Sequence, residues 1–529
     1  MISSGQRCSD RVEPRQERRT IVRAKRGARS PWLLKASAPK TCKGERNFLR
    51  PFGERLSLVN APGLFFLPIV LLFSISLAFS QSATDASLNA VRVSDRASRS
   101  ANGKLAPDIT AAEHMRRAGI YLANRAFAAA REHWQALLDN YPNDSNVPAA
   151  LYGMARSYYV ERRYEEARQV YERVAHDYPQ TKEGREGSNF AASSLLRMGR
   201  GAEAAERYAE YLEKYPNGER IDTAHLNIID GYREAGRPQD AIAWIDRTRA
   251  RFPGTAIEAN AVFARLRLDI AQRDWDHAVL SANELFARPL PSGSNTSADE
   301  LLYLKALSLE RLGRTREAVA TYLMIPTNTN SYYGFLATRR LAGLDDSQAR
   351  QQADARTEAY KSAIARVASD YPAPYRLQVV TEAKKRGLDP RLVLAIMKQE
   401  SAFKPNAKSP SAARGLLQLT IDAAQKYAKR AGIKQLTDDT LYQPGTNIAV
   451  GSEYLSELSR MFAGLPEAIA ASYNGGEDNV ARWLGRTNQK DEGVFAAEVG
   501  FTESKNYVFK VINYYRAYQL LYDSNLNRR

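Results

Sequence analysis

The chain has 529 residues and a formal net charge of +17, with 76 lysines and arginines against 59 aspartates and glutamates. Because 44% of the residues are hydrophobic and 26% are charged, the composition excludes wholesale disorder and a polytopic membrane protein. The 2 cysteines exclude a disulfide scaffold and a zinc-cluster protein, and the length predicts about two to four domains.

Residues 1–57 form a basic arm that holds most of the excess positive charge. The arm contains 15 lysines and arginines and 5 aspartates and glutamates, so it carries +10 of the net charge. Both cysteines, Cys8 and Cys42, also lie in it. A charge of +17 by itself suggests a nucleic-acid binder. No recognised binding motif accompanies the charge, however, so we expect no nucleic-acid partner.

Residues 58–80 are predicted to be a cleaved signal peptide. The apolar run at residues 63–79 follows Arg50 and Arg55, and residues 56–84 contain no charged side chain. The alternative is a membrane anchor, but the run is short for a span and contains Pro68. We therefore expect export to the periplasm, followed by a flexible mature N-terminus at residues 81–104.

The basic arm is far longer than the charged region of an ordinary signal peptide. No methionine occurs between Met1 and Met115. We therefore expect translation to begin near residues 56–59 from a non-methionine start codon. The arm would then be absent from the mature protein, and the mature chain would contain no cysteine, which suits an oxidising compartment.

Residues 105–345 are predicted to form a solenoid of helical hairpins, because two patterns repeat every 37 residues. Each repeat is interpreted as two amphipathic helices ended by an aromatic residue and a proline, since proline cannot continue a helix. The aromatic–proline pairs are Tyr141-Pro142, Tyr178-Pro179, Tyr215-Pro216 and Phe252-Pro253. Small alanines recur at 130, 167, 204, 241 and 278, and bulky residues follow the first four after one helical turn, at Trp134, Tyr171, Tyr208 and Ile245.

This array resembles the tetratricopeptide class of solenoids, with units slightly longer than the usual 34 residues. A further unit, from Tyr303 to Tyr322, follows an insertion at residues 289–297. Two interpretations stay open. The array is either only a scaffold, or it binds a periplasmic protein partner or encircles a substrate, because solenoids bind along their concave face. The five histidines are scattered along this region, so we predict no metal site and no cofactor: His114, His133, His176, His225 and His277.

A new domain is predicted at residues 371–529, after a polar connector at residues 346–370. Its first clear helix begins with Asp389 as N-cap and Pro390 at the first helical position. Val393, Met397 and Glu400 then share one face of that helix. A carboxyl held against apolar surface has a raised pKa, as a general acid near neutral pH requires. The alternative is a solvated glutamate at a frayed helix end.

Two further segments make Glu400 a stronger candidate. Gly415-Leu-Leu-Gln418 follows a turn of small residues and precedes a helix predicted at residues 420–431. A helix of small residues ends in Tyr473-Asn474 and two glycines. An acid with a raised pKa beside amides and an aromatic ring, without histidine or cysteine, indicates carbohydrate chemistry.

These segments resemble, in order, the motifs of the soluble lytic transglycosylases, which are lysozyme-like enzymes acting on bacterial peptidoglycan. The motifs are Glu400-Ser401-x-Phe403, Gly415-Leu-Leu-Gln418, Tyr473-Asn474 and Glu503-Ser-Lys-Asn-Tyr-Val508. The likeness covers about residues 370–525, and Ser331-Tyr-Tyr-Gly-Phe-Leu-Ala337 resembles the segment that leads into the family's catalytic domain. Five places depart from the family pattern: Leu417, Thr420, Ser472, Gly475 and the pair Ser504-Lys505. These departures bear on subsite contacts and substrate preference.

The resemblance implies a mostly α fold, in which a superhelix of tetratricopeptide-like hairpins precedes a lysozyme-like, mainly helical catalytic domain. It implies that Glu400 is the catalytic acid and base and that Ser401 orients it. It further implies that Gln418, Tyr473 and Asn474 contact the substrate or the glutamate. Glu503 matches an acid of the family's cleft.

The implied reaction cleaves the β-1,4 bond between N-acetylmuramic acid and N-acetylglucosamine of peptidoglycan glycan strands and leaves 1,6-anhydromuramic ends. The alternatives are a lysozyme-type hydrolase and a non-catalytic periplasmic scaffold. Most glycosidases use two carboxylates, and this sequence offers one convincing one. The other nearby acids are interpreted as solvated charges: Asp422, Glu453, Glu457, Glu477 and Asp478.

Overall fold

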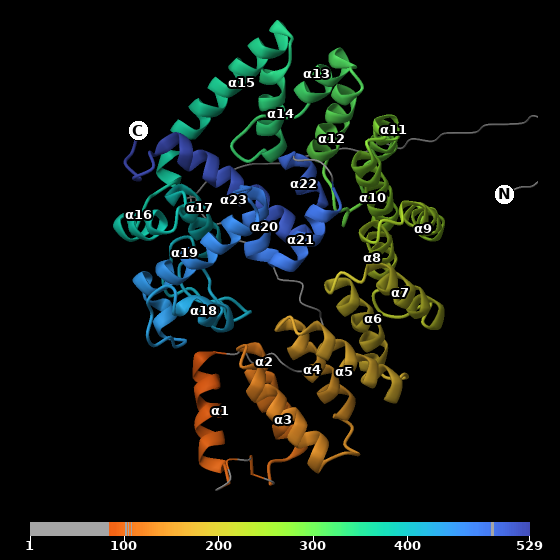
Figure 1. Ribbon diagram of the computed structural model, residues 1–529, viewed down its shortest axis with the longest axis vertical. Helices are drawn as coiled ribbons and strands as arrows, with labels where there is room; N and C mark the ends of the chain where they lie inside the picture. Colours follow the sequence, from red (N-terminus) through yellow and green to blue (C-terminus); the bar gives the residue numbers. More distant parts are fainter. Residues whose placement is uncertain (1–83, 101–102, 104, 107, 488–490) are drawn as a thin grey trace, which may run out of the picture. The chain divides into compact units, whose positions relative to one another are not determined.

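The described part of the chain folds mainly into helices, from α1 (Asp85–Ser98) to α23 (Thr502–Leu521) (Figure 1). The structure is a computed structural model that describes residues 84–529, except 101–102, 104, 107 and 488–490. The predicted mostly helical fold is therefore confirmed. The basic arm and the predicted signal peptide lie outside the described residues.

The repeat array consists of consecutive hairpins whose helices pack against their neighbours in chain order (Figure 1). The alanines that recur every 37 residues are fully buried, and the bulky residues one turn later are buried beside them. Tyr141, Tyr178, Tyr215 and Phe252 each end a helix. The helices are α2 (Ala111–Ala123), α3 (Phe127–Asn140), α4 (Val147–Val160), α5 (Tyr164–Asp177), α6 (Lys182–Arg197), α7 (Gly201–Lys214), α8 (Ile221–Glu234), α9 (Pro238–Arg251), α10 (Ala256–Gln272), α11 (Trp275–Phe286), α12 (Ala298–Arg311), α13 (Thr315–Leu323) and α14 (Tyr332–Gly343).

Residues 85–98 form α1, so the prediction of a flexible segment at residues 81–104 is wrong for this part. Thr84 caps the helix by accepting a hydrogen bond from the Ser87 backbone N–H at 3.1 Å. Leu88 and Val91 lie on one face and are buried. The buried residues of α1 are spaced as on one face of a helix, but α1 is not part of the 37-residue repeat. The repeat pattern therefore does not predict this helix.

The predicted connector at residues 346–370 is largely a helix, α15 (Ser347–Arg366). Asp346 caps it by accepting a hydrogen bond from the Ala349 backbone N–H at 2.8 Å. Its mostly polar sequence buries few side chains, among them Tyr360 and Ile364. Capping and a few apolar contacts therefore support a helix in this polar connector.

The C-terminal domain packs two central helices, α17 (Pro390–Ser401) and α20 (Pro466–Gly475), against the long α23. The helix predicted at residues 420–431 is shorter than expected, because it ends at Ala428 and a turn leads to Gly432. The other helices are α16 (Arg376–Lys385), α18 (Ile421–Ala428), α19 (Pro444–Met461), α21 (Glu477–Gly485) and α22 (Glu492–Glu498).

Ion pairs join the array and α1 to the C-terminal domain. The residues that form these ion pairs lie on helices far apart in sequence, including α1, α8 and α12. The C-terminal domain therefore contacts the array at several separate positions. Three of them are Asp85–Arg414 at 2.6 Å, Arg233–Glu498 at 2.5 Å and Glu300–Lys505 at 3.0 Å.

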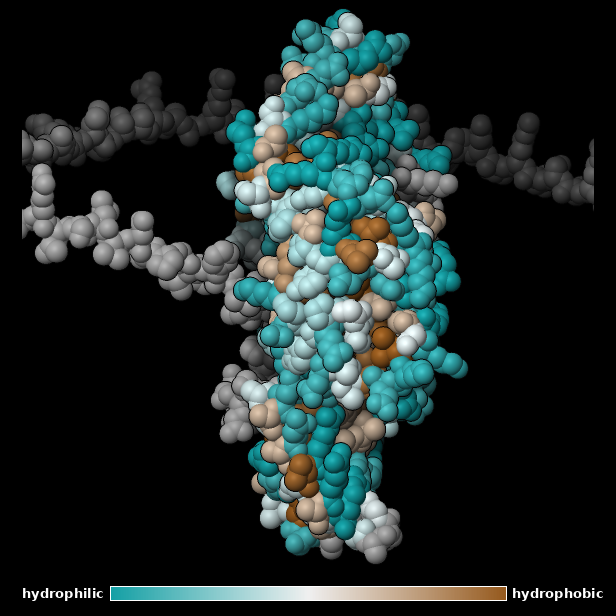
Figure 2. All heavy atoms as spheres, turned by 90° about the vertical axis from the view of Figure 1, so that its left-hand side faces the viewer, coloured by the Kyte–Doolittle hydropathy of each residue, from teal (hydrophilic) through white to brown (hydrophobic). Residues whose placement is uncertain are grey.

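The outer surface is largely hydrophilic on the face that Figure 2 shows, where hydrophobic side chains lie singly or in small groups. Among the helices of the described residues, none has the length and apolar character needed to span a bilayer.

Candidate active site

Glu400 lies near the C-terminal end of α17, whose start matches the prediction. Asp389 caps the helix by accepting a hydrogen bond from the Arg391 backbone N–H at 2.9 Å, and Pro390 occupies the first helical position. Val393 and Met397 are fully buried on the same face as Glu400. The Glu400 side chain itself is half-buried. It therefore lies at the end of an apolar stripe and is not a solvated glutamate at a frayed helix end.

The environment of Glu400 keeps its carboxyl partly protonated near neutral pH. The pKa of Glu400 is raised to about 7, mainly by burial, and the negative charge of Glu503 contributes to the rise. The Tyr507 hydroxyl donates a hydrogen bond to Glu400 Oε1 at 2.6 Å, which lowers that pKa. Because the effect of burial prevails, Glu400 can give up a proton and take one back at neutral pH.

Ser401 fixes the end of α17 to the loop that carries Gln418. Its hydroxyl donates to the Leu416 carbonyl oxygen at 2.8 Å and also contacts the Met397 carbonyl oxygen at 3.3 Å. The structure therefore supports an indirect role, in which Ser401 orients Glu400 by holding the helix end.

Gln418 lies in a tightly bound loop. Its backbone has a positive φ of 46°, and its side-chain nitrogen donates to the Gly415 carbonyl oxygen at 2.8 Å and to the Ala407 carbonyl oxygen at 3.0 Å. The buried Asn447 binds the same loop, because its Oδ1 accepts from the Leu417 backbone N–H at 2.8 Å. Asn447 was missed by sequence reasoning, since an asparagine within a helix carries no distinctive signal.

Tyr473 binds this loop and lies within reach of the charge of Glu400. Its hydroxyl donates to the Leu417 carbonyl oxygen at 2.6 Å, and its ring lies 5.2 Å from the ring of Tyr454, centre to centre. Burial raises the pKa of Tyr473 well above its usual value, and the nearby charge of Glu400 adds to the rise.

Asn474 and Glu503 are the remaining two predicted site residues. The Asn474 Oδ1 accepts a hydrogen bond from the Ser504 hydroxyl at 2.6 Å. Glu503 is exposed in the first turn of α23. The structure therefore places the six predicted residues at helix ends and turns of one domain, where Tyr473 and Glu503 lie close enough to Glu400 to interact with its charge. Their individual roles stay predictions.

Tyr507 is a site residue that sequence reasoning did not select. It lies four residues after Glu503 and so shares a face of α23 with it. The signal was present within the fourth motif, but nothing local shows that Tyr507 meets Glu400, which is 107 positions away.

The interpretation of the neighbouring acids as solvated charges is wrong for several of them. Arg125 binds Asp422 at 2.6 Å, Arg162 binds Glu477, and Arg386 binds Glu453 at 2.5 Å. Two of these arginines belong to the array, and the repeat pattern does not show which residues they meet. Although burial raises the pKa of Asp422 and of Glu477, their arginine partners outweigh it and lower both pKa values. Glu400 thus differs from both acids in the direction of its shift.

The histidines are not all separate in space. His114 and His133 contact each other through their Nδ1 atoms at 2.9 Å, and His133 Nε2 lies 3.1 Å from Asp95 Oδ2. Within the described part of the chain, no group of three or more metal-binding side chains has an arrangement that could hold a metal ion.

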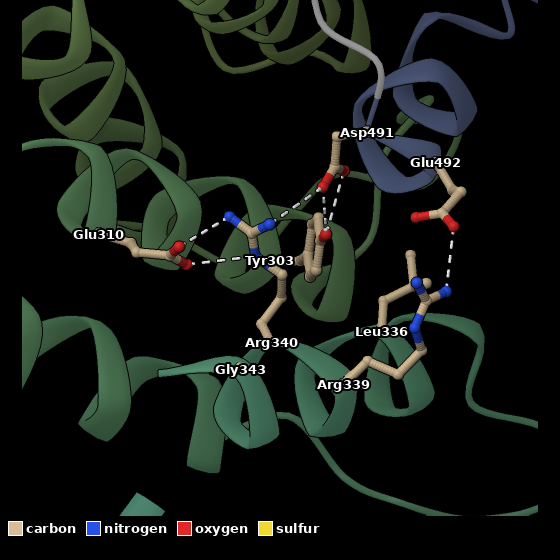
Figure 3. A pocket seen from close by; sticks show the side chains of 8 residues that line it. All are labelled: Tyr303, Glu310, Leu336, Arg339, Arg340, Gly343, Asp491 and Glu492. Atoms are coloured by element: carbon tan, nitrogen blue, oxygen red, sulfur yellow. Dashed lines mark hydrogen bonds and ion pairs between the residues drawn. The ribbon is translucent and has the colours of Figure 1, made fainter. Parts of the chain in front are cut away.

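A cavity of about 190 Å³ lies elsewhere, between α12, α14 and the start of α22 (Figure 3). Its charged side chains bind each other, as in the pairs Arg340–Glu310 at 2.8 Å and Arg339–Glu492 at 3.0 Å. None of the predicted site residues lines it: the lining is Tyr303, Glu310, Leu336, Arg339, Arg340, Gly343, Asp491 and Glu492.

Comparison with known families places two kinds of domain in the chain. Residues 379–495 match the transglycosylase SLT domain, and residues 115–181 and 191–256 match the tetratricopeptide repeat. The SLT match includes Glu400, Gln418, Tyr473 and Asn474 and ends before Glu503.

Curated relatives match the C-terminal part. The soluble lytic murein transglycosylase of Salmonella typhimurium is 30% identical over 169 residues, which are 30% of this chain and 26% of that protein. The soluble lytic murein transglycosylase of Escherichia coli is 34% identical over 123 residues, which are 23% of this chain and 19% of that protein. The chain thus spans about a quarter or less of these relatives. A solved structure of the lytic transglycosylase Slt from Pseudomonas aeruginosa aligns over 77% of this chain and 78% of that one, with 18% identity and a TM-score of 0.44.

Proposed function

This chain carries the SLT domain and the tetratricopeptide repeats of the soluble lytic murein transglycosylase family, and we propose that it is a peptidoglycan lytic transglycosylase. The observation that carries the proposal is the half-buried Glu400, whose pKa is raised to about 7 and whose carboxylate has a hydrogen-bond donor in Tyr507. One carboxyl group with these properties can act first as an acid and then as a base.

In the first step, protonated Glu400 donates its proton to the glycosidic oxygen between N-acetylmuramic acid and N-acetylglucosamine. The bond from C1 of the muramic acid to that oxygen breaks, and the N-acetylglucosamine leaves with a new hydroxyl. The carbonyl of the 2-acetamido group stabilises the positive charge that develops at C1. The Tyr507 hydroxyl stabilises the Glu400 carboxylate that this step creates.

In the second step, the Glu400 carboxylate removes the proton from the C6 hydroxyl of the muramic acid, and O6 bonds to C1. The product has a 1,6-anhydro ring, no water is consumed, and Glu400 regains its proton. Gln418, Tyr473 and Asn474 are proposed to hold the sugars, with Glu503 at the edge of the site. Since the Tyr473 hydroxyl donates to Leu417, its further role is to position the Gln418 loop.

The proposed location is the periplasm, reached by a signal peptide at residues 58–80. In this proposal the basic arm at residues 1–57 is absent from the mature protein. N-terminal sequencing of the mature protein tests both statements. A mature chain that begins near residue 81 supports them, whereas peptides from residues 1–50 in the purified mature protein would contradict the second. Because many array helices already bind the C-terminal domain, a periplasmic protein partner would dock on other faces of the array.

The test of the reaction is mass spectrometry of purified sacculi digested with the wild-type protein and with Glu400→Gln. A transglycosylase releases fragments with anhydromuramic ends, a hydrolase releases reducing ends, and a scaffold releases nothing. We expect anhydro ends from the wild type and no release by Glu400→Gln with an unchanged fold. Release by Glu400→Gln at the wild-type rate would remove Glu400 from the mechanism.

A further inference from the structure

The turns inside the array hairpins share an unusual backbone feature. The residues at 125, 162, 199, 236 and 273, which are spaced 37 apart, all have a positive φ between 61° and 75°. Glycine occupies two of these positions, as a left-handed conformation favours. Arginine occupies the other three positions: Arg125, Arg162 and Arg273. Each of these arginines has a strained backbone conformation that glycine would adopt more easily.

Two of these arginines bind the C-terminal domain at corresponding places. Arg125 makes a two-point ion pair with Asp422, from Nε at 2.6 Å and from Nη2 at 2.7 Å. Arg162 pairs with Glu477 through Nη1 and lies 3.6 Å from Asp478. Arg273 sits in the same kind of turn and is exposed.

The acids that these arginines bind begin the helices that follow the sugar-binding segments. Asp422 is in the first turn of α18, which comes directly after the Gln418 loop. Glu477 begins α21, which comes directly after Tyr473-Asn474. Each arginine therefore fixes the start of a helix next to one proposed substrate contact.

The space beside Gly476 shows how closely Arg162 fits. A Cβ atom added at Gly476 would lie 2.8 Å from Arg162 Nη2 and 3.5 Å from Arg162 Cζ. The guanidinium thus occupies the volume beside the turn at the end of α20. The ring of Tyr454 packs against that of Tyr473 in a tilted arrangement, and the charges of Arg162 and Glu477 both act on Tyr454. The ion pair that Arg162 makes with the C-terminal domain therefore acts electrostatically on the aromatic neighbour of Tyr473.

We propose that Arg125 and Arg162 are positioning residues of the proposed reaction, through which the array sets the spacing of the two sides of the glycan site. Arg125 holds the side that carries Gln418, and Arg162 holds the side that carries Tyr473 and Asn474. Glu400 and Tyr507 lie on α17 and α23, which neither arginine contacts through a hydrogen bond or ion pair among the described residues. The arginines therefore govern glycan binding and leave the acid–base step unchanged.

The test compares Arg125→Gly, Arg162→Gly and the matched control Arg273→Gly in the mature full-length chain. All three place glycine at a left-handed turn, and only the first two remove an ion pair to the C-terminal domain. With solubilised, uncrosslinked glycan strands, we expect KM to rise about tenfold in Arg125→Gly and Arg162→Gly, with kcat within about twofold of wild type. We expect the control to keep both constants, the pH–rate profile to be unchanged in all three, and Arg162→Lys to recover part of the affinity.

Two further measurements separate positioning from general destabilisation and from failure of the proposed reaction. Because Arg125 and Asp422 form one pair, Arg125→Gly with Asp422→Asn should raise KM no more than either change alone. Calorimetry can measure the Kd of the same strands without turnover if each arginine change is combined with Glu400→Gln. We expect this Kd to rise about tenfold when Arg162→Gly is added and not when Arg273→Gly is added. An inactive wild type would refute the reaction alone. Unchanged Kd and KM in both arginine variants would refute the positioning role alone, as would a loss of affinity that the control shares.

Discussion

The Tyr507 hydroxyl on α23 donates a hydrogen bond to Glu400 Oε1 on α17 at 2.6 Å. Burial raises the pKa of Glu400, and this bond opposes the rise by stabilising the carboxylate. The two effects together leave the pKa at about 7, where one carboxyl can serve both halves of the proposed reaction.

Replacing Tyr507 with phenylalanine should therefore shift the pH dependence of the reaction. Without the donor, the pKa of Glu400 rises further, so the alkaline limb of the pH–rate profile moves to higher pH. We also expect kcat to fall about tenfold, because the carboxylate formed in the first step loses a charge-assisted hydrogen bond. The measurement is the initial rate of anhydro-product release from about pH 5 to about pH 9. Tyr518→Phe is the control on the same helix, since its hydroxyl donates to the Pro372 carbonyl oxygen instead. Equal profiles for Tyr507→Phe and wild type would contradict the role given to the bond.

Replacing Glu400 with glutamine should change the pH dependence of stability. Because burial raises the pKa of Glu400 from 4.5 to about 7, the folded state binds this proton more tightly than the unfolded chain does. The stability that results is fully present below about pH 4.5 and is lost as pH rises through about 7. Glutamine does not titrate, so we expect the unfolding free energy of Glu400→Gln, relative to wild type, to rise between these values by about 3 kcal/mol at most. Urea unfolding at a series of pH values measures this difference, and a constant difference would contradict the burial of the carboxyl.

Replacing Gly415 with alanine should displace the Gln418 loop. A Cβ atom there would overlap the Asn447 side chain and the Leu441 carbonyl oxygen, and the backbone has a φ of 79°. Gly432→Ala is the matched control, because its φ of 80° is similar and no atom lies within 4 Å of the added Cβ. We expect the control to lose about 1–2 kcal/mol of stability and Gly415→Ala to lose more, together with most of the activity. Thermal unfolding and product release measure the two effects, and similar losses in both variants would contradict the close packing at Gly415.

Replacing Asp85 with asparagine should weaken the attachment of α1 to the C-terminal domain. Although burial raises the pKa of Asp85, hydrogen bonds from Arg414, Lys408 and Tyr442 outweigh it and lower the pKa to about 2. The stability that these bonds give is present above the unfolded-state value of 3.8 and is lost as pH falls towards about 2. At pH 7 we expect Asp85→Asn to destabilise the protein by about 1–3 kcal/mol, because the guanidinium of Arg414 is fully buried.

The measurement for Asp85→Asn is chemical denaturation, with Asp345→Asn as the control. Asp345 is fully exposed and its ion pair with Arg350 spans 3.5 Å, so its loss should have little effect. A destabilisation of Asp85→Asn that is no larger than that of the control would show that α1 does not depend on this pair.

Local patterns made much of the fold predictable. The alanines of the array recur with a fixed period, and each fills a fully buried position, so the sequence repeat and the packing repeat coincide. Glu400 was predictable for a similar reason, because Val393 and Met397 mark the buried face of its helix. The 37-residue repeat did not include α1, whose apolar face follows the helical period alone.

The contacts between segments distant in sequence were not predictable. Tyr507 meets Glu400 only because α17 packs against α23. Asp422 and Glu477 resemble ordinary surface acids until the array brings Arg125 and Arg162 to them. Such pairings depend on how whole segments pack, and no periodicity along a single segment encodes that.

The carboxylate of Glu498 constrains how this chain could change in evolution. It binds Arg233 at 2.5 Å and Arg267 at 3.1 Å, which come from α8 and α10 in successive hairpins of the array. Repeat proteins commonly gain or lose whole units, because each unit contacts only its neighbours. Here the loss of the hairpin α8–α9 would remove Arg233 from Glu498 and change the spacing between the contacts that the flanking helices make with the C-terminal domain. The contacts with the C-terminal domain therefore constrain the number of repeats. Duplication of a unit, which is common in solenoids, would break these contacts in this protein.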